Sequence, residues 1–176
     1  DDLQFIRFAQ STSPDNHTLY ANVQLFALSG FGEALFKADL SIDPGAGKQW
    51  KQLSSCPGTN DPISVQNNFG YDLAVGVDPQ DANLVYFGNR AVYRITDGGA
   101  GVICTGNRVG LNQIGPDQHA FAFSPPSHIS TAPTRFYVGN DGGIFATGDS
   151  GGIWKSLPGS AACSGANSAL ATILLF

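Results

Sequence analysis

A short segment recurs in this chain at a spacing of 52 residues, and it limits the fold more strongly than any other feature. The clearest copy covers residues 147–154 and reads Thr-Gly-Asp-Ser-Gly-Gly-Ile-Trp. In a second copy, Asp97 and Gly99 each lie 52 residues before Asp149 and Gly151. Similarity at a fixed period of this length predicts a repeat architecture.

A third and longer copy precedes these two. It contains Ser41, Asp43 and Gly45, and its Trp50 lies 52 residues before Val102 of the second copy. Asp, Ser and Gly favour tight turns, and the β-branched and aromatic residues around them favour strands. Each copy is therefore expected to be a hairpin turn, in which the Asp carboxylate accepts backbone N–H bonds and the Trp packs beneath.

The segments between these turns repeat as well. Each contains an apolar strand, a polar turn with a proline, and a second strand centred on a tyrosine. These prolines and tyrosines are Pro14 with Tyr20, Pro79 with Tyr86, and Pro125 with Tyr137. A third strand and the hairpin turn complete four short strands in each unit. Four strands per repeat without helical periodicity predict an all-β fold, a β-propeller portion of about three four-stranded antiparallel blades.

The predicted blades divide one partial propeller domain, residues 1–176. Blade units cover residues 3–53, 71–104 and 118–157, and residues 168–176 begin a further blade. Within the first unit, Gly30-Phe31-Gly32 predicts a hairpin extension. A propeller ring closes with roughly 4–8 blades, so the ring is incomplete in this chain. We expect the remaining blades to come from a longer chain or from other copies; a short open β-sheet protein is the alternative.

The recurring turn resembles the Asp box, or BNR repeat, of sialidases, sortilin-type receptors and xyloglucan-hydrolysing glucanases. The copy at 147–154 matches it with Thr147 in place of the usual serine, the second copy departs at Ile95 and Val102, and the first carries an insertion. The resemblance spans nearly the whole chain and implies a β-propeller. It also implies a structural role, away from catalytic centres, for the turn residues. These are Asp43, Trp50, Thr96, Asp97, Gly99, Thr147, Asp149, Gly151 and Trp154.

Composition excludes several classes of function. The formal net charge is −5, and the nine Lys and Arg form no basic stripe, so no nucleic-acid partner is expected. No apolar segment reaches the roughly 20 residues of a membrane span. No two cysteines stand within four residues of each other and none has a histidine at ligand spacing. We therefore expect no metal site and no cofactor.

Three features favour a secreted or extracellular protein. Lysine is scarce, Asn16-His17-Thr18 is a glycosylation sequon with Asn16 as its acceptor, and the cysteines occupy loop-like positions. Cys56, Cys104 and Cys163 make an odd number. Either two of them form a disulfide that ties loops together, or all are buried or free thiols.

Polar residues mark the entrance of the third predicted blade. His119 precedes its innermost strand, and Asn140 and Asp141 begin the turn between its next two strands. Adjacent strands would bring Asp117, His119 and Asp141 to one rim, and His119, Asn140 and Asp141 are the candidates for binding a sugar hydroxyl array or a cation. In the alternative structural interpretation, His119 bonds the backbone of a neighbouring blade and Asp141 stabilises a type I′ turn.

The carboxylates permit a further hypothesis. An inverting glycoside hydrolase needs two carboxylic acids about 6.5–9.5 Å apart. Asp72 and Asp117 are the only aspartates expected at blade entrances, and they are the catalytic candidates. A sialidase is not expected, because it needs an arginine cluster and a glutamate that supports its nucleophile, and the only glutamate is Glu33.

Two functions thus remain open. One is a non-catalytic propeller scaffold that binds a glycan or a protein partner. The other is a segment of a propeller glycoside hydrolase, similar to xyloglucan-hydrolysing enzymes, that acts on a polysaccharide.

Overall fold

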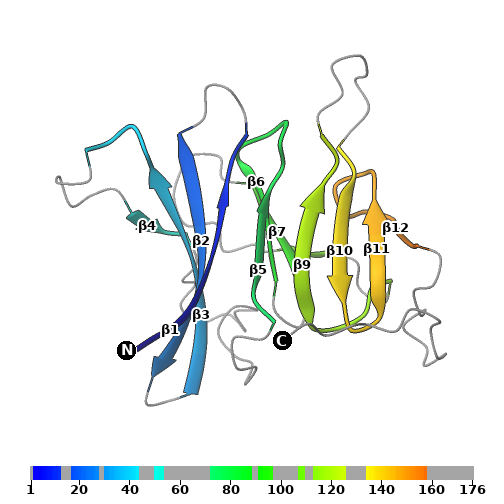
Figure 1. Ribbon diagram of the computed structural model, residues 1–176, viewed down its shortest axis with the longest axis horizontal. Coiled ribbons are helices and arrows are strands. Elements are labelled where there is room, and N and C mark those ends of the chain that lie inside the picture. The colour runs from blue at the N-terminus through cyan, green and yellow to red at the C-terminus, as the bar shows by residue number, and fades with distance from the viewer. Residues whose placement is uncertain are drawn as a thin grey trace.

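The described part of the chain consists of strands and turns. The computed structural model describes residues 2–12, 17–27, 30–43, 50–53, 72–88, 91–96, 107–109, 113–125 and 134–157. Within these ranges there are twelve strands in three four-stranded sheets, and no helix (Figure 1). The same residues therefore hold no helix that is long and apolar enough to cross a membrane.

Each sheet is antiparallel, and its strands follow chain order. The first contains β1 (Asp2–Gln10), β2 (Thr18–Ala27), β3 (Gly30–Asp39) and β4 (Trp50–Gln52). The second contains β5 (Ala74–Val77), β6 (Leu84–Gly88), β7 (Val92–Thr96) and β8 (Asn107–Val109). The third contains β9 (Gln118–Phe123), β10 (Phe136–Asn140), β11 (Gly143–Thr147) and β12 (Trp154–Ser156). The all-β prediction of three four-stranded antiparallel blades is confirmed.

The three sheets stand side by side, with the second between the other two (Figure 1). Their first strands lie next to one another, because β5 contacts both β1 and β9. This arrangement is that of consecutive propeller blades, whose innermost strands line up around a common axis.

The three predicted tyrosines occupy the same position in their sheets. In the second strand of each sheet, the tyrosine pairs with a small residue of the first strand: Tyr20 with Ala9, Tyr86 with Gly76, and Tyr137 with Ala122. The rows continue into the third and fourth strands. The complete rows are Ala9-Tyr20-Lys37-Lys51, Gly76-Tyr86-Arg94-Asn107 and Ala122-Tyr137-Ala146-Lys155. We call these three sets the tyrosine rows.

Two apolar clusters lie between the sheets. In the first, Tyr20, Leu35 and Leu53 of the first sheet pack against Val85 and Phe87 of the second. Alternate side chains of a strand point to opposite faces of its sheet. The second sheet therefore presents a different set of residues to the third sheet.

The second cluster joins the other face of the second sheet to the third sheet. Tyr86 packs on Phe136 with ring centroids 4.2 Å apart and the rings tilted by 32°, and the ring centroid of Phe136 also lies 5.4 Å from that of Trp154. Gly76 leaves room for the ring of Phe123 between the two sheets, because a Cβ at position 76 would lie 2.8 Å from Cε2 of Phe123.

Polar bonds join neighbouring sheets as well. The Tyr20 hydroxyl donates to the carbonyl of Ala82 at 2.9 Å, in the turn between β5 and β6. The Arg94 guanidinium donates to the carbonyl of Ser150 at 2.7 Å, in the turn between β11 and β12. Each tyrosine row in the first two sheets thus reaches a turn of the sheet that follows.

One boundary differs from the prediction, and another agrees with it. The second sheet extends to β8 at 107–109, beyond the predicted end at residue 104. The long β2–β3 pairing ends at Ala27 and Gly30, where the hairpin extension was predicted. Other predictions lie outside the described residues. They concern Asn16, Gly45, Asp97, Gly99, the three cysteines and the blade start at 168–176.

Candidate functional site

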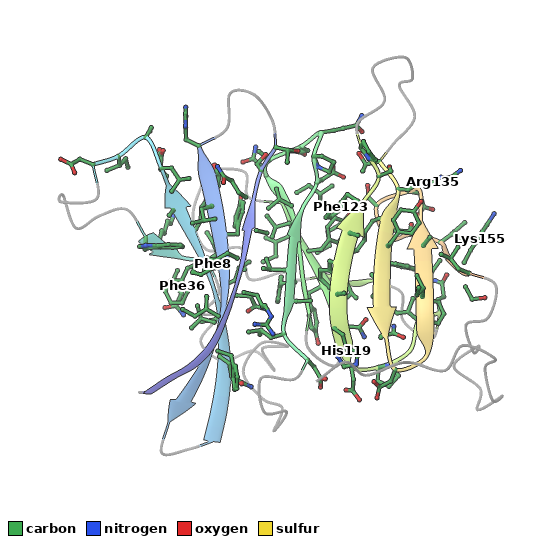
Figure 2. The ribbon with its side chains drawn as sticks, viewed as in Figure 1. Phe8, Phe36, His119, Phe123, Arg135 and Lys155 are labelled. Carbon is green, nitrogen blue, oxygen red and sulfur yellow. The ribbon has the colours of Figure 1, made fainter. Side chains whose placement is uncertain are left out.

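One edge of the molecule gathers the polar residues that the sequence singled out. It is formed by Asp72, just before β5, by the start of β9, and by the turn from β10 to β11. Figure 2 shows His119 at this edge, at the lower end of β9. We call it the His119 edge.

His119 lies between two carboxylates. Its Nε2 donates to Oδ1 of Asp141 at 2.7 Å, and its Nδ1 lies 3.8 Å from Oδ1 of Asp72. Asp141 belongs to the same sheet, whereas Asp72 leads into the neighbouring sheet. The side chains are exposed to different degrees: 50% for Asp141, 22% for His119 and 2% for Asp72. Asp141 is therefore accessible to a ligand, whereas the Asp72 carboxylate is buried and its Oδ1 lies beyond hydrogen-bond distance of the imidazole Nδ1.

A bulge in β9 aims His119 at this edge. Gly139 pairs with Ala120, but the next residue, Asn140, pairs with Gln118, so that His119 is the extra residue. Bulges re-aim side chains and are frequent next to functional sites. Here the bulge explains why His119 reaches Asp141 of the adjacent turn.

Asn140 stabilises the His119 edge through buried hydrogen bonds. It is buried, and its Nδ2 donates to the carbonyl of Gly115 at 3.0 Å and to Oε1 of Gln118 at 3.2 Å. Its Oδ1 accepts the backbone N–H of Gly142 at 2.9 Å. Asn140 was predicted as a binding residue, but these bonds give it a structural role, because its amide is turned into the protein.

Gly115 and Gln118 complete this internal network. Gln118 is fully buried, and its Nε2 donates to the carbonyl of Gly115 at 2.9 Å. A Cβ on Gly115 would lie 2.9 Å from Oδ1 of Asn140, so no larger residue fits there. Sequence reasoning assigned no role to Gln118. No sequence signal distinguishes a buried glutamine from an exposed one in a polar segment.

The two catalytic candidates differ in how far they are exposed. Asp72 is buried, with 3% of its surface exposed. Asp117 is half-buried, and its φ of 61° lies in the left-handed region, which Asp tolerates better than most residues. Asp72 lies beside His119, with its Oδ1 3.8 Å from Nδ1 of the imidazole.

Metal binding finds no support in the same region. Within the described ranges, no three His, Cys, Asp or Glu side chains are grouped so that they could hold an ion.

The 147–154 turn has the geometry that its sequence predicts. Thr147 Oγ1 donates to Oδ1 of Asp149 at 2.6 Å and accepts the N–H of Gly151 at 3.1 Å. The Asp149 carboxylate in turn accepts the N–H of Ile153 at 2.9 and 3.0 Å. The hydrogen bonds from Thr147 and then from Ile153 hold the pKa of Asp149 below its ordinary value. Trp154 packs beneath, and its Nε1 donates to the carbonyl of Gly151 at 3.1 Å.

The first copy of this turn has a longer loop than the third. Pairing makes Trp50 equivalent to Trp154, and it makes Ala38, which has no hydroxyl, equivalent to Thr147. The carboxylate seen to accept turn bonds is that of Asp39, from the N–H and the hydroxyl of Ser41 at 2.9 and 2.6 Å. The loop between Ala38 and Trp50 is five residues longer than the loop between Thr147 and Trp154, and the bonds of Asp39 lie at its start.

A cavity lies at the opposite end of the inner strands. It has a volume of about 470 Å³ and is lined by residues of β1, β5 and β9, including Val75, Phe121 and Phe123. Gln10 and Ser124 add polar groups at its border. It is separate from the His119 edge, because these residues lie toward the other ends of the same strands.

The fold and the sheet arrangement define a portion of a β-propeller. The crystal structure of the GH74 enzyme of Niastella koreensis is similar, with a TM-score of 0.50 and 14% sequence identity over 88% of this chain and 22% of that one. The chain thus spans about a fifth of the length of that enzyme, and at this identity the likeness concerns the fold. No protein-family model matches the chain, and no curated protein matches its sequence.

Proposed function

We propose that this chain is part of a secreted Asp-box β-propeller that binds a neutral glycan at the His119 edge. The observation that carries this proposal is the half-exposed Asp141 carboxylate held at 2.7 Å by His119. A carboxylate and an imidazole accept and donate hydrogen bonds, as an array of sugar hydroxyls requires.

The rigidity of the edge supports the proposal. Sites whose side chains are locked by buried hydrogen bonds lose little freedom on binding. The Asn140, Gln118 and Gly115 network fixes the turn that carries Asp141, and the bulge fixes His119.

The Asp-box assignment is part of the proposal and rests on the 147–154 turn. Its support is that the side chains of Thr147 and Asp149 accept hydrogen bonds from the backbone N–H groups of Gly151 and Ile153. This turn lies between β11 and β12, whereas the His119 edge lies between β10 and β11, so the two do not overlap.

Binding can be tested with soluble polysaccharides. We expect the protein to be retarded in native gels that contain a β-glucan such as xyloglucan, and Asp141→Asn and His119→Ala to weaken the dissociation constant about 10-fold each. Asp81→Asn is the matched control, because it removes the same charge from a turn at the far end of β5. The proposal would be refuted if no neutral glucan of a panel retarded the protein. It would also be refuted if Asp141→Asn were retarded as strongly as the wild type.

Secretion has its own test. The sequon at Asn16 predicts a mobility shift on N-glycosidase treatment after expression through a eukaryotic secretory pathway, absent in Asn16→Gln. A protein that passes through that pathway with no glycan at Asn16 would contradict the use of this sequon.

A second candidate is a segment of a propeller glycoside hydrolase, which the likeness to the GH74 enzyme favours. We would then expect the protein to release reducing sugar from a β-glucan, and Asp72→Asn and Asp117→Asn to abolish this release. Release that survives both substitutions would discard these two residues as its acid and base. No release while binding persists favours the scaffold.

A further inference from the structure

The first and the third sheet each have one outer face. By strand register, each of these faces is equivalent to a face that is buried between two sheets elsewhere in the molecule. The tyrosine rows of the first two sheets are covered by the next sheet, and Tyr20 and Tyr86 are 0% and 1% exposed. The third row lies on the far side of the last sheet. Its Tyr137, Ala146 and Lys155 line an open hollow of about 590 Å³. We call this surface the trailing face.

The first sheet carries the complementary surface. By register, Phe8, Phe36 and Trp50 are equivalent to Phe121, Phe145 and Trp154 of the third sheet. In the third sheet, these positions pack against the second sheet, and Phe145 and Trp154 are only 1% and 6% exposed. We call the surface formed by Phe8, Phe36 and Trp50 the leading face.

The leading face is open to solvent. Phe8 is 58% exposed and Trp50 is 45% exposed, and their rings lie 6.3 Å apart. Figure 2 shows Phe8 and Phe36 on the first sheet and Arg135 and Lys155 at the other end of the molecule, on the outer side of the third. The two faces therefore lie at opposite ends of the row of sheets.

From this equivalence we infer that the leading face of one copy of this chain binds the trailing face of a second copy. The contact continues an interface that the chain already makes twice, between its first and second and its second and third sheets. Such a contact is heterologous, and it ends in a closed ring when the rotation closes. Two copies bring together six sheets, within the roughly 4–8 blades of closed propellers.

This inference does not depend on glycan binding at the His119 edge. The residues of the two faces lie on β1, β3, β4, β10, β11 and β12 and include none of the proposed glycan contacts. A variant that no longer binds glycan can therefore still be tested for self-association, and a variant that stays monomeric can still be tested for glycan binding.

The decisive experiment uses two variants with opposite faces altered. One carries Phe8→Glu and Trp50→Glu, and the other carries Tyr137→Glu and Lys155→Glu, so that both altered faces become acidic. Equilibrium sedimentation of the wild type is expected to give twice the chain mass of 18.4 kDa. Each variant alone should weaken self-association at least about 30-fold, since buried aromatic anchors dominate such interfaces.

Mixing the two variants separates this contact from other modes of association. Each variant retains the face that the other lacks, so an equimolar mixture should form a one-to-one heterodimer, held by one intact contact and open at the other, that neither variant forms alone. His17→Glu combined with Thr12→Glu is the control for the Phe8→Glu, Trp50→Glu variant, because it adds the same two negative charges at exposed positions outside both faces and should leave the dimer intact.

A spectroscopic measurement covers the case in which a double variant fails to fold. Trp50 is exposed in one copy and would be covered in a dimer, so the tryptophan emission of the wild type should shift to longer wavelength on dilution. The single substitution Trp50→Phe should remove that shift, because Trp154 is already buried. A wild type that stays monomeric up to about 100 µM, where even weak specific contacts form, overturns the inference. Self-association of the Tyr137→Glu, Lys155→Glu variant as strong as that of the wild type also overturns it.

Discussion

Thr147 and Asp149 show how two side chains organise a turn that has few backbone bonds of its own. Between them they accept the N–H groups of Gly151 and Ile153. The backbone can take this path because Gly151 adopts a φ of 93°. Most residues resist that conformation, whereas glycine adopts it at little cost.

Substituting Gly151 with alanine should therefore destabilise the protein. We expect Gly151→Ala to lower the free energy of unfolding by about 1–3 kcal/mol, measured by urea denaturation. Gly148→Ala in the same turn is the control, because its Cβ meets no atom within 4 Å. Equal losses in the two variants would show that the left-handed conformation of Gly151 is not the cause.

Asp149 also predicts how stability depends on pH. Its hydrogen bonds with Thr147 and Ile153 lower its pKa from the ordinary 3.8. Its ionised form therefore stabilises the fold at pH values above 3.8, and this contribution is lost as the pH falls through the folded-state pKa. We expect the wild type to lose stability more steeply than Asp149→Asn in urea denaturation between about pH 6 and pH 2.

Asp39 contributes to the same acid sensitivity, since the hydrogen bonds with Ser41 lower its pKa too. Asp149→Asn should therefore retain part of the slope, and Asp39→Asn combined with Asp149→Asn should retain less. Parallel curves for Asp149→Asn and the wild type over the whole range would rule out the contribution of Asp149.

At the scale of single elements, the β10–β11 turn is fixed by the segment that precedes β9. The side-chain amide of Asn140, at the β10–β11 turn, donates to the carbonyl of Gly115 and to the side chain of Gln118. These two bonds join the turn to that segment. The N–H of Asp141 adds a bond to the carbonyl of Pro116 at 3.3 Å. The position of the His119 edge thus depends on a buried polar network, which is costly when only partly satisfied.

Asn140→Asp tests that network with almost no change of shape. The substitution removes two donors and sets a buried carboxylate against the oxygens of Gly115 and Gln118. We expect a loss of at least about 2 kcal/mol in the free energy of unfolding. Asp141→Asn, one residue further and half exposed, should change it by less than about 1 kcal/mol. A stable Asn140→Asp protein would mean that the network does not hold the turn.

At the scale of the whole molecule, aromatic packing joins the second and third sheets. Phe136 is at the centre, with ring centroids of Tyr86, Phe123 and Phe121 within 4.2, 4.8 and 5.1 Å. Burial raises the pKa of Tyr86 to about 12, which reflects how completely the contact excludes water.

Removing the Phe136 ring should loosen this contact. We expect Phe136→Ala to cost about 3–5 kcal/mol in the free energy of unfolding and Phe136→Leu to cost less. Hydrogen exchange should then be faster in β6 and β10, on the two sides of the contact. Faster exchange confined to the first sheet, far from Phe136, would contradict this account.

Much of the fold was predictable because the repeat carries it. The 52-residue spacing and the tyrosine of each second strand predicted three equivalent sheets, and Tyr20, Tyr86 and Tyr137 occupy one register position. The meeting of His119 and Asp141 was also predictable, since it follows from adjacent strands. Such short-range patterns can be recognised in the sequence because each repeat unit forms the same local strand pairing.

The sequence by itself thus determined the number of sheets, their four antiparallel strands and the tyrosine of each second strand. Only the tertiary structure decided that Asn140 and Asp72 are buried, that Asp39 stabilises the first hairpin, and that Trp50 is exposed while its equivalent Trp154 is covered. The reason is physical: the repeat sets strand pairing, whereas burial depends on a bulge, a loop length and the presence of a neighbouring sheet.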